Sequence, residues 1–208
     1  MNLLEIQNAT FLPESIRQFD YHLFSKMNGQ WHNAFSDVFF PFIREPTVWV
    51  PFYFFLILLV TLNFTVRGWI WVAFILMNVG LSDFVSSHLI KHNFLRLRPC
   101  HDPVLFSHIR FLVAYCPGSS SFTSSHAVNH FALAMFIFTT FRKALSPLWA
   151  LLFIWAAAIS YAQVYVGVHF PFDIFCGMIV GLILGYIPAT IFNRTFGLKV
   201  PKMNIKYD

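Results

Sequence analysis

The feature that most constrains this chain is a set of long apolar stretches that carry almost no charge. A helix needs about 20 predominantly apolar residues to cross the hydrocarbon core of a bilayer, and each stretch approaches that length. The pattern therefore predicts an all-α integral membrane bundle of about five transmembrane helices. The predicted spans cover residues 49–66, 69–90, 126–141, 148–166 and 172–192.

The composition agrees with a membrane protein that forms one domain over residues 1–208. Hydrophobic residues make up 57% of the chain and charged residues only 11%, less than half the share usual in soluble domains. Residues 1–10 have neither the basic start nor the apolar core of a cleavable signal peptide, so we expect none. The net charge of +5 is scattered rather than striped, which argues against nucleic acid as a partner and fits anionic lipid headgroups.

Residues 1–44 are amphipathic rather than spanning. Ile16, Phe19, Leu23 and Phe24 fall near one helical face, and Asn28-Gly29 is expected to end that helix. Residues 31–43 repeat the pattern with aromatic side chains. Both segments are predicted to be helices that lie in the membrane interface or pack on its rim.

The last predicted span contains Gly177, Gly181 and Gly185. This spacing of small residues favours close helix contact, although ordinary glycine usage in a span explains it equally well.

Three polar segments interrupt the apolar pattern. They are residues 91–99, 119–130 and 168–173. With five spans, the ends of the second and fourth and the starts of the third and fifth share one membrane face. All three polar segments are therefore predicted to meet there, with residues 91–125 as the active-site loop.

The residue types in these segments suit a phosphate group. Lys91 and Arg98 provide a point charge and a planar fork, and Ser124 and Ser125 provide donors at a helix N-terminus. His126 adds an acid or base. Taken singly, the two cations also fit a basic interface collar, and the serines also fit a helix cap.

The third polar segment pairs a histidine with a carboxylate. His169 and Asp173 are four residues apart, a spacing at which the carboxylate can hold the imidazole in one tautomer. An imidazole oriented in this way is a competent nucleophile toward phosphorus. A single histidine–carboxylate pair more often has a structural role, but the convergence of three polar segments favours a catalytic role for this one.

The same residues resemble the tripartite signature of the type 2 phosphatidic-acid phosphatase superfamily, whose usual form is K-x6-RP, PSGH and SR-x5-H-x3-D. The resemblance covers roughly residues 81–185. The matching segments here are Lys91-x6-Arg98-Pro99, Thr123-Ser124-Ser125-His126 and Gln163-x5-His169-x3-Asp173.

The resemblance implies a phosphatase that works without a metal or other cofactor. His169 would attack phosphorus and form a phosphohistidine, and Asp173 would orient it. His126 would protonate the leaving group. The equatorial phosphate oxygens would be held by Lys91, Arg98, Ser124 and the backbone N–H of Ser125.

Three positions depart from the family pattern. Thr123 and Ser125 replace Pro and Gly, which is tolerable if the backbone N–H still points inward. Gln163 replaces an arginine, so a charge-assisted phosphate contact is lost, and Arg96 or Arg110 is a hypothetical substitute. Asp83, inside the second span, is expected to support the site by bonding a serine or Lys91.

Cys100 and Cys116 flank the predicted site loop. In an oxidising compartment they can form a disulfide that clamps this loop. The alternative is a zinc site made by these cysteines with His101 and His108, for which the adjacent Cys100 and His101 are poor ligand geometry.

The resemblance extends to bacterial lipid phosphatases, so the substrate expected is a lipid phosphate, with undecaprenyl diphosphate and lipid A phosphate preferred over phosphatidylglycerol phosphate and phosphatidic acid. Four aromatic residues of the predicted site loop are expected to form the lipid-facing mouth: Phe94, Phe106, Phe111 and Tyr115.

The positive-inside rule puts the basic tail in the cytosol and the site on the periplasmic side of a bacterial inner membrane. A non-catalytic lipid-phosphate binding or transport protein is the alternative, and the sequence does not indicate an oligomeric state.

Overall fold

The computed structural model describes residues 11–141 and 147–198, and these residues form helices without strands. Residues 1–10, 142–146 and 199–208 lie outside the described ranges. They include Arg142-Lys143, where the sequence predicts a turn between the third and fourth spans, and most of the basic tail. The all-α prediction is confirmed. In chain order the helices are α2 (Glu14–Phe24), the π-helical η1 (Ser25–Gln30), α3 (Ala34–Ile43), the 3-10 helix η2 (Pro46–Trp49), α4 (Val50–Phe84), the π-helical η3 (Val85–Ile90), α5 (Lys91–Asn93), the 3-10 helix η4 (Pro99–His101), α6 (Ser125–Phe141), the 3-10 helix η5 (Pro147–Ala150), α7 (Leu151–Tyr165) and α8 (Pro171–Thr195).

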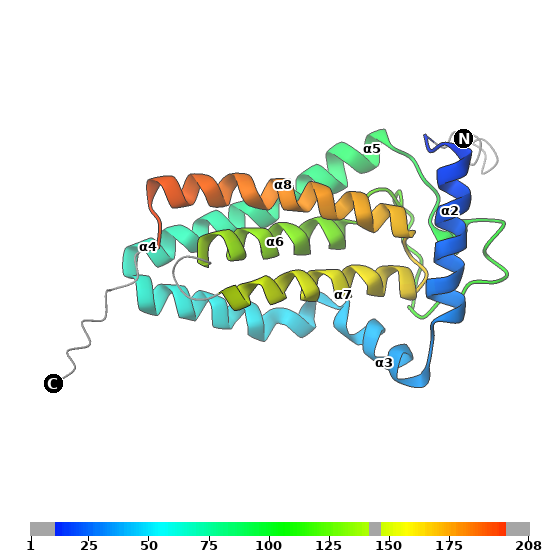
Figure 1. Ribbon diagram of the computed structural model, residues 1–208, viewed down its shortest axis with the longest axis horizontal. Coiled ribbons are helices and arrows are strands. Elements are labelled where there is room, and N and C mark those ends of the chain that lie inside the picture. The colour runs from blue at the N-terminus through cyan, green and yellow to red at the C-terminus, as the bar shows by residue number, and fades with distance from the viewer. Residues whose placement is uncertain (1–10, 142–146, 199–208) are drawn as a thin grey trace.

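Helix α4 contains the first two predicted spans. Thr65 leaves the helical conformation, with φ 48° and ψ −125°, and the two halves of α4 run in opposite directions on either side of this break (Figure 1). A side chain at Gly68 would place its Cβ 2.1 Å from the carbonyl oxygen of Val60, so the turn requires glycine there. A straight helix of 35 residues would measure about 52 Å, well beyond the roughly 30 Å hydrocarbon core.

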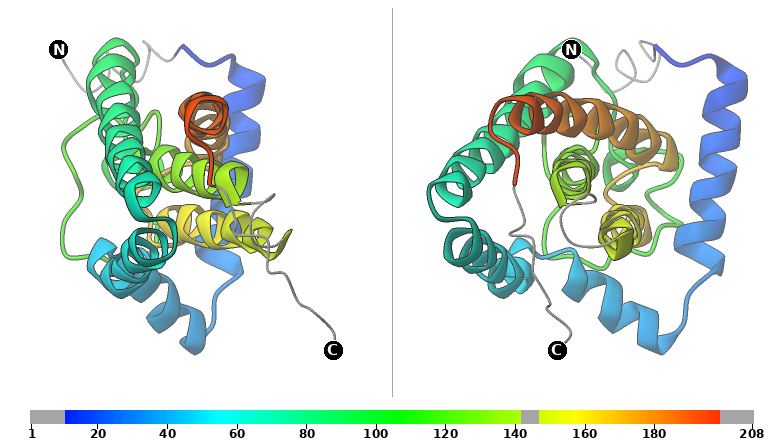
Figure 2. Two further views of the ribbon diagram at one scale, coloured as in Figure 1. Left: turned by 90° about the vertical axis from the view of Figure 1, so that its left-hand side faces the viewer. Right: turned by 60° about the vertical axis from the view of Figure 1, so that its left-hand side comes forward.

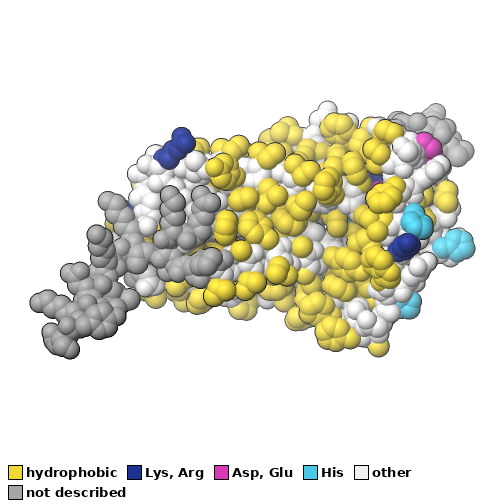
Figure 3. Space-filling model, viewed as in Figure 1, with side chains coloured by type: hydrophobic (Ala, Val, Ile, Leu, Met, Phe, Trp, Pro, Cys, Tyr) yellow, Lys and Arg dark blue, Asp and Glu magenta, His cyan; other side chains and the backbone are white. Residues whose placement is uncertain are grey.

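Three described stretches are long and apolar enough to cross a membrane: Pro46–Asn93, Leu148–Tyr165 and Pro171–Thr195. The first of these contains the broken α4, and the 17-residue α6 is slightly shorter than a full span. If the halves of α4 are counted separately and α6 is included, the number of crossings is about five, close to the number that the sequence predicts. On the face drawn in Figure 3, hydrophobic side chains cover the middle, and the charged and histidine side chains that can be seen lie toward the ends. The chain is an integral membrane protein.

Helix α6 lies at the centre, surrounded by α4, α7 and α8 (Figure 2). The predicted close contact at the glycine positions is confirmed, because a Cβ at Gly181 would lie 2.4 Å from the carbonyl oxygen of Val128. At Gly185 the corresponding distance to Ala132 is 2.2 Å. These contacts bring the α6 and α8 backbones together and fix the relative positions of their N-termini.

The N-terminal helix α2 lies across the ends of the bundle helices (Figure 1). Its apolar face is split between two environments, since Phe24 is buried while Phe19 is exposed. The predicted end at Asn28-Gly29 is slightly early, because the helix continues to Gln30 as η1. Asn28 is buried there, and its Nδ2 donates to the carbonyl oxygens of Arg110 at 2.8 Å and Tyr165 at 2.7 Å. These bonds attach the N-terminal segment to the site loop and to the end of α7.

Candidate active site

The three polar segments meet at one end of the bundle. The starts of α6 and α8 lie at the same end as α5 and the end of α7, with the site loop beside them (Figure 1). The backbone N–H of Ser124 donates to the carbonyl oxygen of Asp173 at 3.3 Å, and Arg98 reaches His169. Segments far apart in the sequence therefore contribute to one site.

His169 occupies the short connection between α7 and α8. Its Nε2 lies 3.0 Å from an Arg98 guanidinium nitrogen, and its Nδ1 lies 3.5 Å from the Asp173 carboxylate. An ionised carboxylate can accept hydrogen bonds but cannot donate one. The arrangement therefore favours a proton on Nδ1 of His169 and a lone pair on Nε2. Burial lowers the pKa of His169 to about 4, although the neighbouring Asp173 opposes this shift. The imidazole is therefore neutral at pH 7.

Asp173 is fully buried in the first turn of α8 and is held on several sides. Its carboxylate accepts the Phe170 backbone N–H at 2.9 Å, the Ser121 hydroxyl at 2.5 Å and an Arg96 guanidinium nitrogen at 2.5 Å. Arg96 also binds the carboxylate of Asp20 on α2 at 2.5 Å. The group that faces His169 is thus immobilised from the loop, from α8 and, through Arg96, from α2.

Arg98 is also buried and preorganised. Its guanidinium donates to the carbonyl oxygens of Ser119 and Val168 at 3.0 Å each, and to the Ser119 hydroxyl at 3.1 Å. Burial lowers its pKa to about 10; Asp173 opposes this shift, and the positive charge of Arg44 adds to it. Arg98 and Asp173 are also near enough to Lys91 for their charges to act on it.

The N-terminus of α6 provides hydroxyls and an imidazole. The Ser124 hydroxyl accepts the Ala127 backbone N–H at 3.4 Å and so caps the helix, which leaves its own hydrogen available for donation. Ser125 lies within hydrogen-bond distance of the hydroxyls of Ser86 at 2.9 Å and Ser87 at 3.3 Å. His126 follows in the first turn, where the charges of Arg44, His169 and Lys91 act on it.

Asp83 supports this region from α4. Its carboxylate accepts from Ser87 at 3.3 Å and from Asn129 at 3.4 Å. The expected serine partner of Asp83 is therefore Ser87. The charge of Asp83 acts on Lys91, but no hydrogen bond joins these two described residues.

Gln163 is buried at the end of α7, and its side-chain carbonyl accepts from Nε of Arg44 at 3.4 Å. The Gln163 Nε2 has no hydrogen-bond partner among the described residues. The hypothesis that Arg96 or Arg110 replaces the charge missing at position 163 does not fit their contacts. Arg96 pairs with Asp20 and Asp173, and Arg110 pairs with Asp37 at 2.6 Å. The guanidinium next to Gln163 belongs instead to Arg44.

Known proteins resemble this chain over most of its length. The family model described as the PAP2 superfamily matches residues 68–196, more than half of the chain. The chain belongs to the PAP2 superfamily. It is therefore a phosphatase of that family, and the resemblance inferred from the three motifs is confirmed.

Individual relatives cover nearly the whole PAP2 chain. A lipid A 4'-phosphatase of Porphyromonas gingivalis is 32% identical over 195 residues, covering 90% of this chain and 80% of the relative. An undecaprenyl-diphosphatase of Sulfolobus acidocaldarius is 26% identical, covering 89% and 80%. The crystal structure of a transmembrane PAP2-type phosphatidylglycerolphosphate phosphatase from Bacillus subtilis superposes with a TM-score of 0.70 over 92% of both chains, at 18% identity. That likeness concerns the fold alone.

Two residues that contact the PAP2 site lie outside the matched region and were not predicted from the sequence. Asp20 follows Ile16 by four residues and precedes Phe24 by four, so it falls on the predicted apolar face of α2. A carboxylate on such a face signals a buried partner. Arg44 gives a weaker signal, as a basic residue directly after an apolar aromatic helix.

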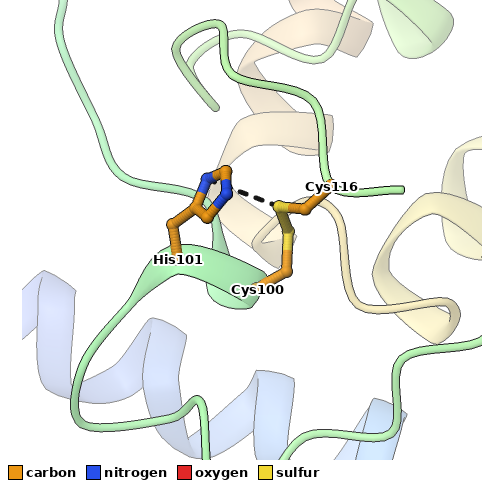
Figure 4. Close-up of side chains that lie close together, drawn as sticks. All are labelled: Cys100, His101 and Cys116. Carbon is orange, nitrogen blue, oxygen red and sulfur yellow. Dashed lines mark hydrogen bonds between the residues drawn. A yellow bond between two sulfur atoms is a disulfide. The ribbon is translucent and has the colours of Figure 1, made fainter.

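The cysteines of the PAP2 site loop are joined. Cys100 and Cys116 form a disulfide with their Cα atoms 6.1 Å apart, and His101 Nδ1 lies 3.4 Å from the Cys116 sulfur (Figure 4). Zinc binds cysteine as a thiolate, so the disulfide form of this loop is not a zinc site. The alternative zinc site also included His108, but this residue is not part of the group that Cys100, His101 and Cys116 form.

The aromatic residues expected at a lipid-facing mouth are mostly accessible. Phe94, Phe106 and Tyr115 are exposed, and Phe111 is half-buried beside the connection between α7 and α8.

Proposed function

We propose that this PAP2 phosphatase hydrolyses a lipid phosphate through a phosphohistidine at His169. The observation that carries the proposal is the buried, neutral imidazole between Arg98 and Asp173, with Nε2 3.0 Å from the guanidinium. A phosphate that binds Arg98 brings its phosphorus close to the lone pair of Nε2.

The reaction proceeds in two displacements. Nε2 of His169 attacks phosphorus, the bond to the leaving oxygen breaks, and His126 donates a proton to that oxygen. A water molecule then loses a proton to His126 and attacks the phosphohistidine, which releases inorganic phosphate and restores neutral His169. Arg98, Lys91, Ser124 and the Ser125 backbone N–H stabilise the charge on the phosphate oxygens.

The preferred substrates are undecaprenyl diphosphate and lipid A phosphate. Two relatives that cover most of this chain carry these activities in their names. The exposed aromatic side chains Phe94, Phe106 and Tyr115 provide an apolar rim through which a lipid can present its phosphate.

The proposed location of the site is the periplasmic side of a bacterial inner membrane. The Cys100–Cys116 disulfide at the site end supports this side, because such bonds persist in oxidising compartments. Treating intact cells with a membrane-impermeant reductant and then a membrane-impermeant maleimide tests it. Labelling of both cysteines is expected, and labelling only after cell lysis would place the site in the cytosol.

The activity test is phosphate release from a panel of lipid phosphates by detergent-solubilised protein. His169→Ala is expected to abolish release, orthovanadate to inhibit it, and His108→Ala, an exposed loop histidine, to leave it unchanged. An acid-labile phosphoenzyme should be trapped with wild type and not with His169→Ala. Equal turnover by wild type and His169→Ala would overturn the mechanism, and binding without turnover would favour a non-catalytic binding protein.

A further inference from the structure

Arg44 is brought to the site by the corner that follows α3. Its backbone N–H donates to the Phe40 carbonyl oxygen at 3.3 Å, and the Trp49 indole donates to the Ile43 carbonyl oxygen at 2.7 Å, which fixes the corner. The Arg44 side chain is only 15% exposed. Its Nε is directed to the Gln163 side-chain carbonyl, so the guanidinium has a defined orientation beside the site.

The charge on Arg44 is poorly compensated inside the protein. Its one carboxylate partner among the described residues is Glu45, at 3.2 Å, whose own side chain is 54% exposed. The Arg44 charge acts on Arg98 and on His126, and burial lowers the pKa of Arg44. Across residues 11–141 and 147–198, neither Lys91 nor Arg98 forms a salt bridge. Like charges held together in a low-dielectric site favour an anion between them.

Gln163 supplies a second, independent observation. The side chain is 1% exposed, its carbonyl is used by Arg44, and its Nε2 has no partner among the described residues. Buried donors are nearly always paired in folded proteins, and an unpaired one calls for a ligand or an ordered water. An oxygen of a bound phosphate would accept from this amide and from the adjacent guanidinium.

We propose that Arg44 and Gln163 together bind one oxygen of the substrate phosphate. The Gln163 carbonyl orients the Arg44 guanidinium, and the Gln163 Nε2 donates to the same phosphate. In this way the corner after α3 supplies the positive charge that the PAP2 pattern would place at position 163. The inference rests on the proposed phosphatase function, and Arg44 lies outside the family match at residues 68–196.

A charge-swap series tests this pairing. Arg44→Gln is expected to lower kcat/KM on the best lipid phosphate by roughly 100- to 1,000-fold, as for removal of one donor that binds developing charge. Arg44→Lys should retain part of the activity. Gln163→Arg alone should lower it, because two guanidinium groups then compete for one position. The double variant with Arg44→Gln and Gln163→Arg should recover most of the loss, since the charge returns to the same phosphate. The matched control Arg17→Gln, an α2 arginine paired with exposed Glu14, should match wild type.

Orthovanadate and inorganic phosphate binding separate this inference from the proposed function. Weaker binding of both anions by Arg44→Gln, restored in the double variant, would support the phosphate site even if no lipid phosphate were hydrolysed. Active wild type with an equally active Arg44→Gln would overturn the inference and leave the phosphatase function intact. Loss in Arg44→Gln without recovery in a folded double variant would also overturn it, because a merely structural arginine cannot be moved to position 163.

Discussion

Replacing Arg96 tests whether the buried charge network around Asp173 is organised as described. Arg96 is the common partner of two carboxylates, with one guanidinium nitrogen 2.5 Å from Asp20 and another 2.5 Å from Asp173. Its guanidinium carbon also lies 4.1 Å from the centre of the Phe170 ring. Arg96→Gln therefore leaves two buried carboxylates without their cation.

The expected loss is large because all three side chains are buried. The exposed fraction of the side chain is 5% for Arg96, 3% for Asp20 and 0% for Asp173. Removing one partner of a buried ion pair typically costs about 3–5 kcal/mol, since the remaining charge has no compensation. For a chain of this size, that corresponds to a fall in Tm of about 6–20 °C.

The second substitution gives the sharper test. Asp20→Asn alone should be mild, because Arg96 retains Asp173 and the new amide oxygen can still accept the Phe172 backbone N–H that Asp20 accepts at 2.8 Å. Adding Asp20→Asn to Arg96→Gln should raise the Tm above that of Arg96→Gln, because one uncompensated carboxylate is removed. Thermal unfolding of the purified proteins in detergent measures the Tm of the wild type and of the three variants.

The pH dependence of Arg96→Gln should have a definite sign. Burial already raises the pKa of Asp20 while Arg96 opposes that shift, so removing the arginine should raise the pKa further. A carboxyl whose folded pKa exceeds its unfolded value binds more protons in the folded state, so stability increases as pH falls. Arg96→Gln should therefore regain stability below neutral pH. Additive losses in the double variant, or no gain on acidification, would refute the described network.

Three other predictions concern separate features. Gly185→Ala should lower the Tm because its Cβ would lie 2.2 Å from the Ala132 carbonyl oxygen, whereas Gly80→Ala, with nothing within 4 Å, should not. Replacing both Cys100 and Cys116 by alanine should reduce the free energy of unfolding by about 3 kcal/mol, because the disulfide closes a loop between residues 16 apart in the sequence. Denaturant unfolding measures this loss. The His169 imidazole should titrate near pH 4 by NMR; a midpoint near that of free histidine would contradict its burial.

The sequence was sufficient to predict the helical bundle and the meeting of three polar segments at one end of it. Apolar stretches without charge leave helices as the only spanning structure available to such a chain. The ordering of three polar segments at span ends then places Lys91, Arg98, His126 and His169 on one face. Each of these inferences uses a local pattern and the alternation of helix direction, which is why no tertiary detail was needed.

Asp20 and Arg44 were missed because their roles depend on how α2 and α3 pack against the bundle. Nothing near Asp20 in the sequence identifies Arg96, 76 residues later, as its partner. Likewise, Arg44 and Gln163 are 119 residues apart. The hypothesis that Arg96 or Arg110 supplies the missing charge could be tested only by the folded contacts, which pair Arg96 with Asp173 and Arg110 with Asp37.

The two missed residues are connected to His169 by two different chains of contacts. In the first, Asp20 holds Arg96, which holds the Asp173 carboxylate that faces His169 Nδ1. In the second, Arg44 contacts the Gln163 side chain, and the Gln163 backbone carbonyl accepts the His169 backbone N–H at 3.2 Å. Because α2 lies across the end of the bundle, its position there is coupled to the orientation of His169 (Figure 1). Asp20 and Arg44 lie outside the family match at residues 68–196, and we expect substitutions at these two positions to alter phosphate chemistry through the contacts just described.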